Sequence, residues 1–200
     1  MNRHHNTSGL ILAGGKAQRM GGNDKGLIEL NGRAMIEHVI DGLQPQVQTI
    51  LINANRNVDT YKKYGFKVLE DRLEDFQGPL AGFASGMEHC KTDYIATVPC
   101  DGPFISPDYV DRLHKAVSSE RAMICVADDG HRLQPVYALI HTSLLDSLMK
   151  FLATGDRKID RWYESVNFAK ADFSDVAEMF TNVNTPKELD EVGLNLSGQI

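Results

Sequence analysis

The chain has 200 residues, of which 42% are apolar and 24% charged, so it can bury a core without disulfides or a structural metal. These proportions exclude a disordered chain, a collagen, a coiled coil and a disulfide scaffold. The net charge is −6, because 27 acidic residues outnumber 21 basic ones. This balance argues against nucleic acid or an anionic membrane as the main partner.

Cysteine usage and the early sequence indicate where the protein works. Cys90, Cys100 and Cys125 are odd in number and form no CxxC pair, so neither a disulfide framework nor a zinc site is predicted. Free thiols fit a reducing compartment. The early apolar run at 10–13 is too short for a signal peptide or a membrane span. We therefore expect a cytoplasmic protein with no membrane partner.

In the first half of the chain, short apolar runs alternate with stretches of helical periodicity. Strands are predicted at residues 9–12, 27–30, 49–52, 67–69 and 94–98, and helices at 35–43, 58–64 and 80–90. Asn31-Gly32 predicts a tight turn, while Pro45 and Gly65 follow the ends of the first two helices. Ser106 and Pro107 predict the N-cap and first residue of a further helix.

The second half begins with a predicted hairpin, since apolar runs at 123–127 and 136–140 flank the turn Asp128-Asp129-Gly130. Helices are then expected at 143–152 and 158–163, a strand at 168–173, and a last helix from the capping box at 185–188. Strand–helix alternation through residue 118 predicts an α/β fold with a mostly parallel, twisted sheet and helices on both faces. We expect residues 1–200 to form a single domain, with residues 1–7 disordered.

Polar residues follow four of the predicted strands, at the position where ligands bind in open parallel sheets. Gly14-Gly15 follows the strand at 9–12, Asn53 the strand at 49–52, Asp71 the strand at 67–69 and Asp101 the strand at 94–98. A glycine loop, an amide and two carboxylates thus converge on one edge. This convergence predicts a site for a nucleotide or another phosphorylated ligand.

The segment from Gly14 to Gly26 has the composition of a phosphate-binding loop. Its five glycines let backbone N–H groups approach phosphate oxygens closely. Lys16, Arg19 and Lys25 against Asp24 make it locally basic on an acidic chain. The alternative is a solvated surface loop. Because the chain has no GxG, GK[ST], HExxH or GxSxG motif, the dinucleotide fingerprint, the P-loop and the simplest protease and hydrolase interpretations are excluded.

Three further positions have two possible interpretations each. Asp101, between two prolines, is well placed for Mg²⁺ shared with phosphates, or else it is a turn residue; Cys100 beside it is expected to be a buried packing residue. The segment 78–82 opens a helix that allows close approach either to a ligand or to the sheet. Asn182 and Asn184 are not explained by helix capping, although they also fit a turn.

LAGGKAQRMGGNDKG resembles the nucleotidyltransferase signature loop LAGGxxxRMGxxK. NANRN, DFQGPLAG, VPCDGPF, DGHRLQPVYAL and NVNTPKEL then resemble, in order, the molybdenum cofactor guanylyltransferase (MobA-type) family over roughly residues 8–190. The resemblance implies a Rossmann-like α/β nucleotidyltransferase fold. It also implies transfer of GMP from GTP to molybdopterin carrying molybdenum, with Mg²⁺ as cofactor and pyrophosphate as the second product.

The resemblance also implies roles for residues that match the family's motifs. The residues implied at the nucleotide are Leu12, Ala13, Gly14, Gly15 and Gly78 lining the GTP site, Asn53 and Asp71 at the nucleoside, Arg19 and Lys25 on the triphosphate, and Asp101 on Mg²⁺ and GTP. Arg19, Lys25 and Asp101 are the implied catalytic residues. Asn182 and Asn184 are implied to lie near the pterin, and Gln134 stands where the family pattern has a histidine.

Two other functions stay open from the sequence. One is a nucleotidyltransferase of the same architecture with another base or acceptor, such as a cytidylyl or sugar-phosphate enzyme. The other is a non-catalytic module that senses GTP or carries the pterin. The expected partners are GTP, the molybdenum-bound pterin, and proteins that supply the acceptor or receive the product.

Overall fold

The structure is a computed structural model, and it describes residues 3–13, 24–71 and 78–182. The central sheet has seven strands in the order β5-β4-β1-β6-β8-β7-β9. Their bounds are β1 (His4–Leu12), β4 (Val47–Asn53), β5 (Lys67–Leu69), β6 (Tyr94–Pro99), β7 (Ile124–Asp128), β8 (Leu133–His141) and β9 (Ala169–Asp172). Only β8 runs antiparallel to its neighbours β6 and β7 in this sheet. The predicted mostly parallel sheet is confirmed.

Four parallel strands end level with one another at one edge of the sheet. Leu12 at the end of β1 is in register with Asn53 of β4 and Pro99 of β6. Asn53 is in turn in register with Leu69, the last residue of β5. The residues that follow these strands therefore start from neighbouring positions, at the edge where parallel sheets bind ligands.

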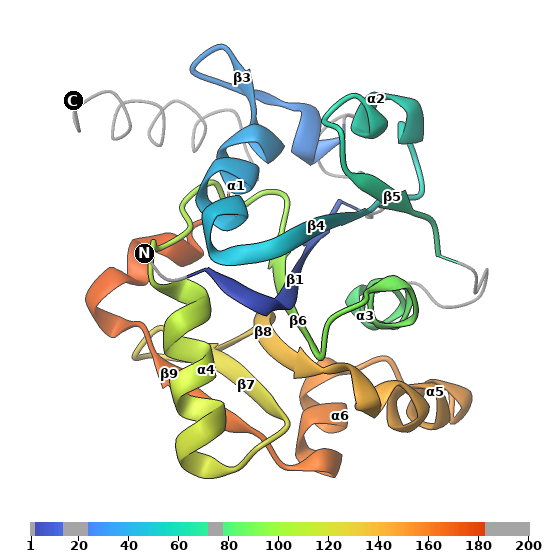
Figure 1. The fold of residues 1–200 in the computed structure, drawn as a ribbon, viewed down its shortest axis with the longest axis vertical. Helices are drawn as coiled ribbons and strands as arrows, with labels where there is room; N and C mark the ends of the chain where they lie inside the picture. The colour runs from blue at the N-terminus through green and yellow to red at the C-terminus, as the bar shows by residue number, and fades with distance from the viewer. Residues whose placement is uncertain (1–2, 14–23, 72–77, 183–200) are drawn as a thin grey trace.

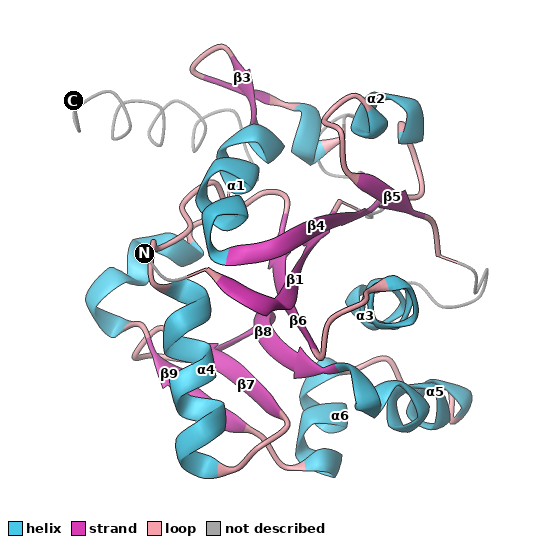
Figure 2. Ribbon diagram, viewed as in Figure 1, coloured by secondary structure: helices cyan, strands magenta, loops and turns pink. Residues whose placement is uncertain are grey.

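Helices cover both faces of the sheet (Figures 1 and 2). One face carries α1 (Met35–Leu43) and α4 (Tyr109–Glu120), and the other carries α3 (Pro79–His89), α5 (Leu145–Ala153) and α6 (Ile159–Val166). The short helix α2 (Val58–Lys62) connects β4 to β5. Each face buries its own apolar cluster, and Tyr61 of α2 belongs to the cluster under α1 and α4.

Smaller elements join these layers. They are the 3-10 turns η1 (Lys25–Leu27), η2 (Gln44–Gln46), η3 (Thr142–Leu144) and η4 (Ser174–Phe180), and the hairpin of β2 (Glu29–Leu30) with β3 (Arg33–Ala34). Asn31 and Gly32 both have positive φ, 52° and 75°, and form the tight turn predicted for this hairpin. The strand predicted at 27–30 is shorter because the Asp24 side chain caps η1 by accepting from Gly26 N.

The start of the chain differs from the prediction. β1 begins at His4, so residues 4–7, which were expected to be disordered, belong to the sheet. Thr7 is fully buried and in register with Tyr94 of β6, and the His4 ring stacks on His114 of α4 at 4.3 Å. Pairing and ring stacking thus extend the strand beyond the apolar run that the sequence pattern detected.

The start of α4 also differs from the prediction. The helix begins at Tyr109 with Asp108 as its N-cap, rather than at Pro107 with Ser106 as the cap. Ser106 and Pro107 instead belong to a turn that Tyr109 N closes by donating to Ser106 O at 3.0 Å. The helix predicted from the capping box at 185–188 lies outside the described residues.

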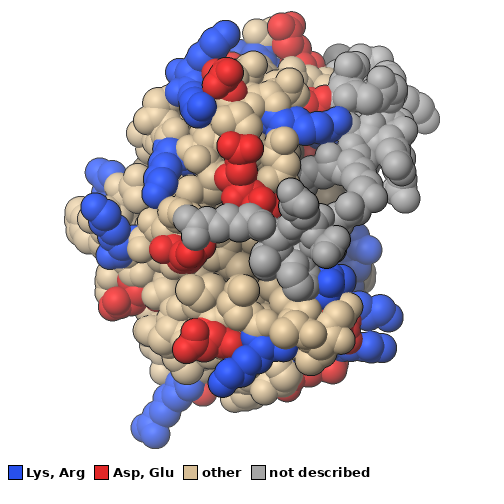
Figure 3. Space-filling model, turned by 90° about the vertical axis from the view of Figure 1, so that its right-hand side faces the viewer, with Lys and Arg blue, Asp and Glu red and all other residues tan. Residues whose placement is uncertain are grey.

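The surface and the thiols complete the description. Within the ranges given above, no helix combines the length and the apolar character needed to cross a membrane. All three cysteines are free, with Cys100 and Cys125 buried and Cys90 partly buried. On the face that carries α3 and α5, side chains of both charge signs are interspersed among uncharged ones (Figure 3).

Candidate functional site

Backbone hydrogen bonds continue across the strands just beyond the edge of the sheet. Ala13 N donates to Asn53 O at 2.8 Å, and Cys100 N donates to Leu12 O at 3.1 Å. The first residues after β1 and β6 are therefore held against the last residues of β4 and β1. The candidate site is built on this edge.

Asn53, the last residue of β4, and Asp71, two residues after β5, are in direct contact. Asn53 is 3% exposed, and its Nδ2 donates to Asp71 Oδ1 at 2.9 Å. Asn55 holds the other side of Asp71: its Nδ2 donates to Asp71 Oδ2 at 2.7 Å, and its Oδ1 accepts from Asp71 N at 2.7 Å. Both carboxylate oxygens thus have an amide partner, which fixes the orientation of Asp71 at the end of β5.

Lys25 and Asp101 form an ion pair on the same edge. Lys25 Nζ lies 2.8 Å from Asp101 Oδ2, and the side chains are 27% and 14% exposed. Partial burial makes the attraction between these charges stronger than in a fully solvated pair. The pair brings together the cation of η1 and the carboxylate after β6, two residues that the sequence had placed at one site.

Gly26, next to Lys25, allows η1 to pack against the end of β6. A Cβ at this position would lie 2.6 Å from the Tyr61 hydroxyl and 3.2 Å from Cys100 Sγ. Burial, and then the nearby Asp101 carboxylate, raises the pKa of the Cys100 thiol. The thiol therefore stays protonated and buried, as expected for a packing residue rather than a nucleophile.

Helix α3 packs closely against the same strand ends. A Cβ on Gly82 would lie 2.6 Å from both Asn53 Oδ1 and Leu12 Cδ2. Gly78, the N-cap of α3, has φ of 140°, a conformation that favours glycine. The sequence left open whether these glycines serve a ligand or packing. Gly82 packs the helix onto the sheet beside Asn53 and so shapes one wall of the site.

On the far side of Asp101 the chain brings in residues from the second half. Gly102 leaves space for the Tyr137 hydroxyl, which a Cβ there would overlap, and that Cβ would stand 3.5 Å from Asn182 Oδ1. Asn182 therefore lies beside the residue that follows Asp101. Gln134 at the start of β8 is held by Asp129, to whose Oδ2 its Nε2 donates at 2.6 Å.

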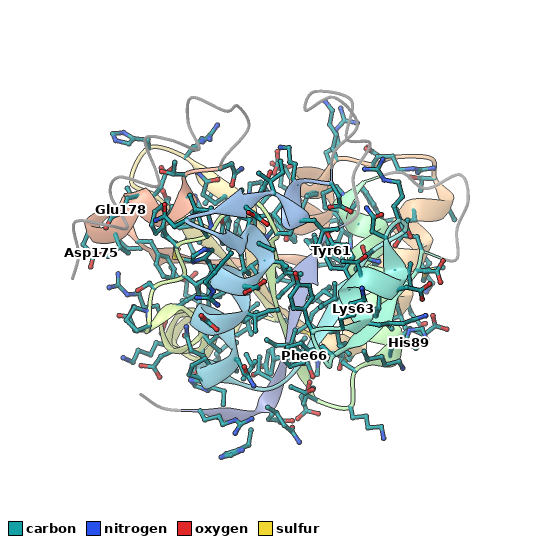
Figure 4. The ribbon with its side chains drawn as sticks, turned by 90° about the horizontal axis from the view of Figure 1, so that it is seen from above. Tyr61, Lys63, Phe66, His89, Asp175 and Glu178 are labelled. Carbon is teal, nitrogen blue, oxygen red and sulfur yellow. The ribbon has the colours of Figure 1, made fainter. Side chains whose placement is uncertain are left out.

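The two pairs lie at different places along the strand order. In Figure 4, Asp175 and Glu178 of η4 lie on one side of the molecule, and Tyr61 of α2 lies closer to its middle. Asn53 ends β4 and Asp71 lies two residues after the edge strand β5. Asp101 follows β6, with Lys25 of η1 beside it, and β1 separates β6 from β4. One end of the site thus carries amides and a carboxylate, and the middle carries a cation and a second carboxylate.

The structure brings together seven of the predicted positions, namely Leu12, Ala13, Lys25, Asn53, Asp71, Asp101 and Asn182. Gly78 begins α3, whose Gly82 lies against Asn53 and Leu12. Gly14, Gly15, Arg19 and Asn184 lie outside the described residues. Sequence reasoning missed the residues that hold the site together, namely Asp24, Asn55, Asn57 and Tyr61. The alternating asparagines at 53, 55 and 57 after β4 were the available signal.

Comparisons with known proteins agree with this architecture. The family described as "MobA-like NTP transferase domain" matches residues 9–171. A Shewanella sp. (strain MR-4) protein named molybdenum cofactor guanylyltransferase is 52% identical over 179 residues, which are 90% of this chain and 91% of that protein. A protein of the same name from Vibrio parahaemolyticus is 52% identical over 187 residues, covering 94% of this chain and 95% of that one.

Solved structures show the same fold at lower sequence identity. The molybdopterin-guanine dinucleotide biosynthesis protein A from Archaeoglobus fulgidus has a TM-score of 0.80 and 23% identity, over 96% of this chain and all of that one. A CMP:2-keto-3-deoxy-manno-octonic acid synthetase complexed with CTP has a TM-score of 0.75 and 14% identity, over 97% and 99%. The fold is therefore shared among nucleotidyltransferases of different substrates.

Proposed function

The chain belongs to the family of MobA-like NTP transferases, and from this premise we propose that it transfers GMP from GTP to molybdopterin carrying molybdenum. The products are the guanine dinucleotide form of the cofactor and pyrophosphate. The observation that carries the proposal is the position of two pairs along one edge of the sheet, Asn53 with Asp71 at the ends of β4 and β5 and Lys25 with Asp101 at the end of β6. Such an edge offers polar partners to a nucleoside at one end and a cation to its phosphates at the other.

The nucleoside is proposed to lie against Asn53 and Asp71. Guanine has donors at N1 and N2 and an acceptor at O6, and these two side chains with the backbone near Leu12 and Gly78 offer groups of both kinds. Asn55 holds Asp71 in place for this contact. The choice of guanine over another base is supported by the names of the relatives.

The triphosphate is proposed to lie along the segment from Ala13 to Lys25. Lys25 supplies a positive charge next to Asp101, and Gly14, Gly15 and Arg19 are proposed to supply backbone N–H groups and a guanidinium. A cation there stabilises the charge that accumulates on the leaving pyrophosphate.

The proposed reaction is a single in-line displacement at the α-phosphorus of GTP. A phosphate oxygen of the pterin substrate forms the new P–O bond, while the bond from the α-phosphorus to the bridging oxygen breaks and its electron pair leaves with pyrophosphate. A phosphate monoester has a second pKa of about 6, so this nucleophile is already ionised near neutral pH. The protein therefore needs no general base and acts by positioning and charge stabilisation.

Asp101 fits a Mg²⁺ ion that it shares with the substrate. Within the described parts of the chain, no group of three or more His, Cys, Asp or Glu side chains is arranged to hold a metal by itself. Mg²⁺ typically takes one or two carboxylates and completes its shell with phosphate oxygens and water, so a single partly buried carboxylate suits it. When bound, the ion would neutralise charge at the α-phosphate.

The acceptor is proposed to approach from the side of Asn182 and Asn184. Asn182 lies beside Gly102, next to the carboxylate proposed to face the α-phosphate. The turn between β7 and β8 flanks the same side, because β8 is the neighbour of β6. Gln134 keeps this turn in place through Asp129.

Because the acceptor and the product are both labile, we also propose two kinds of partner protein, one that supplies the acceptor and one that receives the product. A cytoplasmic setting fits the three free thiols.

A thermal-shift panel with GTP, CTP, ATP and UTP, each with and without Mg²⁺, tests the nucleotide assignment. A nucleotide at about 100 times its dissociation constant adds roughly 2.7 kcal/mol, or about 5–10 °C at this chain length. A GTP-selective shift supports the proposal, whereas a CTP-selective shift indicates a cytidylyl-transferring enzyme. Pyrophosphate release that depends on the pterin acceptor then separates an enzyme from a module that only binds GTP.

A further inference from the structure

Asp24 is an almost fully buried carboxylate that belongs to neither of the two pairs of the candidate site. It is 8% exposed, yet it accepts hydrogen bonds from the Tyr61 hydroxyl at 2.6 Å, Asn57 Nδ2 at 3.1 Å and Gly26 N at 3.3 Å. Burying a carboxylate is costly unless several donors satisfy it. The arrangement of Asp24, Tyr61 and Asn57, here called the Asp24 clasp, therefore holds the main chain at residue 24 in one place.

The donors of the clasp are themselves rigidly held. Tyr61 is fully buried on α2, and burial raises the pKa of its phenol, so the hydroxyl stays protonated and donates. That hydroxyl lies 2.6 Å from where a Cβ on Gly26 would stand, so the turn and the ring are in close contact. Asn57 is the N-cap of α2 and has φ of 51°. Helix α2 thus supplies both side-chain donors from one rigid segment.

Lys25 stands between the two residues that the clasp fixes. Asp24 caps the turn through Gly26 N, and its backbone carbonyl accepts from Leu27 N at 3.0 Å. The main chain is therefore fixed on both sides of Lys25, whose Nζ reaches Asp101. A cation on a long side chain loses less conformational freedom at its target when its backbone is already fixed.

We propose that Asp24, held by Tyr61 and Asn57 of α2, is a positioning residue that fixes Lys25 where its ammonium meets Asp101 and the nucleotide phosphates. Asp24 itself touches neither the phosphates nor the reacting atoms; it acts through Lys25. For the reaction that it serves, this inference rests on the proposed function. The clasp connects helix α2, which carries none of the residues predicted at the strand ends, to Lys25.

The test compares Tyr61→Phe with Tyr109→Phe in the purified full-length protein. Each variant removes one buried hydroxyl hydrogen bond from the same apolar cluster, since the Tyr109 hydroxyl donates to Thr97 O at 2.7 Å. Tyr61→Phe is expected to lower kcat for acceptor-dependent pyrophosphate release about ten-fold, with a smaller change in the KM for GTP. Tyr109→Phe is expected to keep the wild-type kcat at a similar loss of melting temperature.

A double-mutant cycle shows whether the effect passes through Lys25. In the Lys25→Ala background, adding Tyr61→Phe is expected to change kcat less than about two-fold, because the side chain that it positions is gone. Equal losses in both backgrounds, or a wild-type kcat for Tyr61→Phe, would overturn the inference. Asn57→Gly keeps a residue suited to positive φ and removes the amide donor, so it repeats the test if Tyr61→Phe folds poorly.

Amide hydrogen exchange separates this inference from the proposed function. Without any substrate, exchange at Gly26 and Leu27 is expected to accelerate in Tyr61→Phe and not in Tyr109→Phe. Unchanged exchange in both variants would overturn the clasp even where the wild-type enzyme is active. If the wild type itself released no pyrophosphate, the proposed function would be contradicted. The hydrogen-exchange measurement would still show whether the clasp holds residues 26 and 27 in place.

Discussion

Lys25 Nζ lies 2.8 Å from Asp101 Oδ2, so the cation proposed for the triphosphate and the carboxylate proposed for the metal form an ion pair. The contact joins residues 76 positions apart, one in η1 and one after β6. It is therefore a product of the fold rather than of local sequence.

Asp101→Ala is expected to abolish GMP transfer while the protein still folds, because the carboxylate is proposed to serve the metal and GTP together. Lys25→Ala is expected to lower kcat by about 10²–10³-fold, the usual cost of removing one group that stabilises developing charge. Steady-state pyrophosphate release measures both. Asp59→Ala, which removes an exposed carboxylate paired with Lys62, is the control and should keep wild-type activity. Wild-type turnover by Asp101→Ala would refute the assignment.

Lys25→Met is expected to change metal and nucleotide affinity in opposite directions. The variant keeps an unbranched side chain but removes the ammonium that occupies Asp101 Oδ2. Mn²⁺ binding without nucleotide should therefore become tighter, by several-fold at the effective dielectric of a partly exposed site. GTP binding should become weaker, since a phosphate partner is lost. Electron paramagnetic resonance titration with Mn²⁺ and calorimetry with GTP measure the two; weaker Mn²⁺ binding would show that the ammonium does not compete for Asp101.

Asn55→Ala is expected to raise the dissociation constant for GTP roughly ten-fold, because hydrogen bonds to a charged group contribute about 1.5–3 kcal/mol. The substitution frees both Asp71 Oδ2 and Asp71 N, which Asn55 contacts at 2.7 Å each. Asn6→Ala is a matched control, because Asn6 makes the same reciprocal pair with Asp93 at the opposite end of the sheet. Equal GTP affinity in the two variants would mean that Asp71 does not need Asn55.

The strand ends could be predicted from sequence because parallel strands are continuous apolar runs and the polar residue after each stands out. Asn53, Asp71 and Asp101 were located in this way, and the structure brings the first two into contact. The residues that hold these side chains in place could not be located from the same pattern. The Asp24 carboxylate and the Tyr61 hydroxyl meet across 37 positions inside the core, and an apolar ring on a short helix gives no sign of its hydroxyl's partner.

The same limit applies to the ends of elements. β1 starts at His4 rather than near Gly9 because Thr7 and Ser8 are buried by neighbouring strands, a tertiary effect that periodicity does not contain. The sequence showed Asp24 as one charge among several in a loop. In the structure its carboxylate caps η1 and accepts hydrogen bonds from three donors.

Gly82→Ala is expected to weaken GTP binding, because the new Cβ would lie 2.6 Å from Asn53 Oδ1 and displace that amide. Gly86→Ala, one turn later on α3, brings a Cβ within 2.5 Å of Leu10 in the core instead. Both substitutions overpack the helix–sheet contact, at a cost of about 1–3 kcal/mol in unfolding free energy. Calorimetric titration should then show reduced GTP affinity for Gly82→Ala alone. Equal loss in both would mean that α3 acts on the site only through overall stability.

A last prediction concerns acid stability, at the end of the sheet opposite the site. Burial, and then the neighbouring His4, lowers the pKa of His114 from 6.5 to about 4, while Asp111 opposes the shift. The ring also touches Tyr94 and contacts Thr7 Oγ1 at 2.8 Å. The native protein therefore keeps His114 neutral where the unfolded chain would bind a proton.

The sign follows from proton linkage. Between pH 6.5 and 4 the unfolded state binds more protons at His114 than the native state does, so the free energy of unfolding rises with pH in this window. The stabilising contribution of His114 is lost as the pH falls through the same window. The loss is about 2 kcal/mol after allowing for solvent screening of a partly buried ring. Urea unfolding of wild type and His114→Gln at pH 7 and pH 4.5 measures it, and the difference between the two pH values should be smaller in the variant. Taking the difference between proteins cancels the contribution of carboxylates that do not act on His114, such as Asp108, which also destabilise the fold in acid. The same pH dependence in both proteins would show that His114 protonates as readily in the native state as in the unfolded chain.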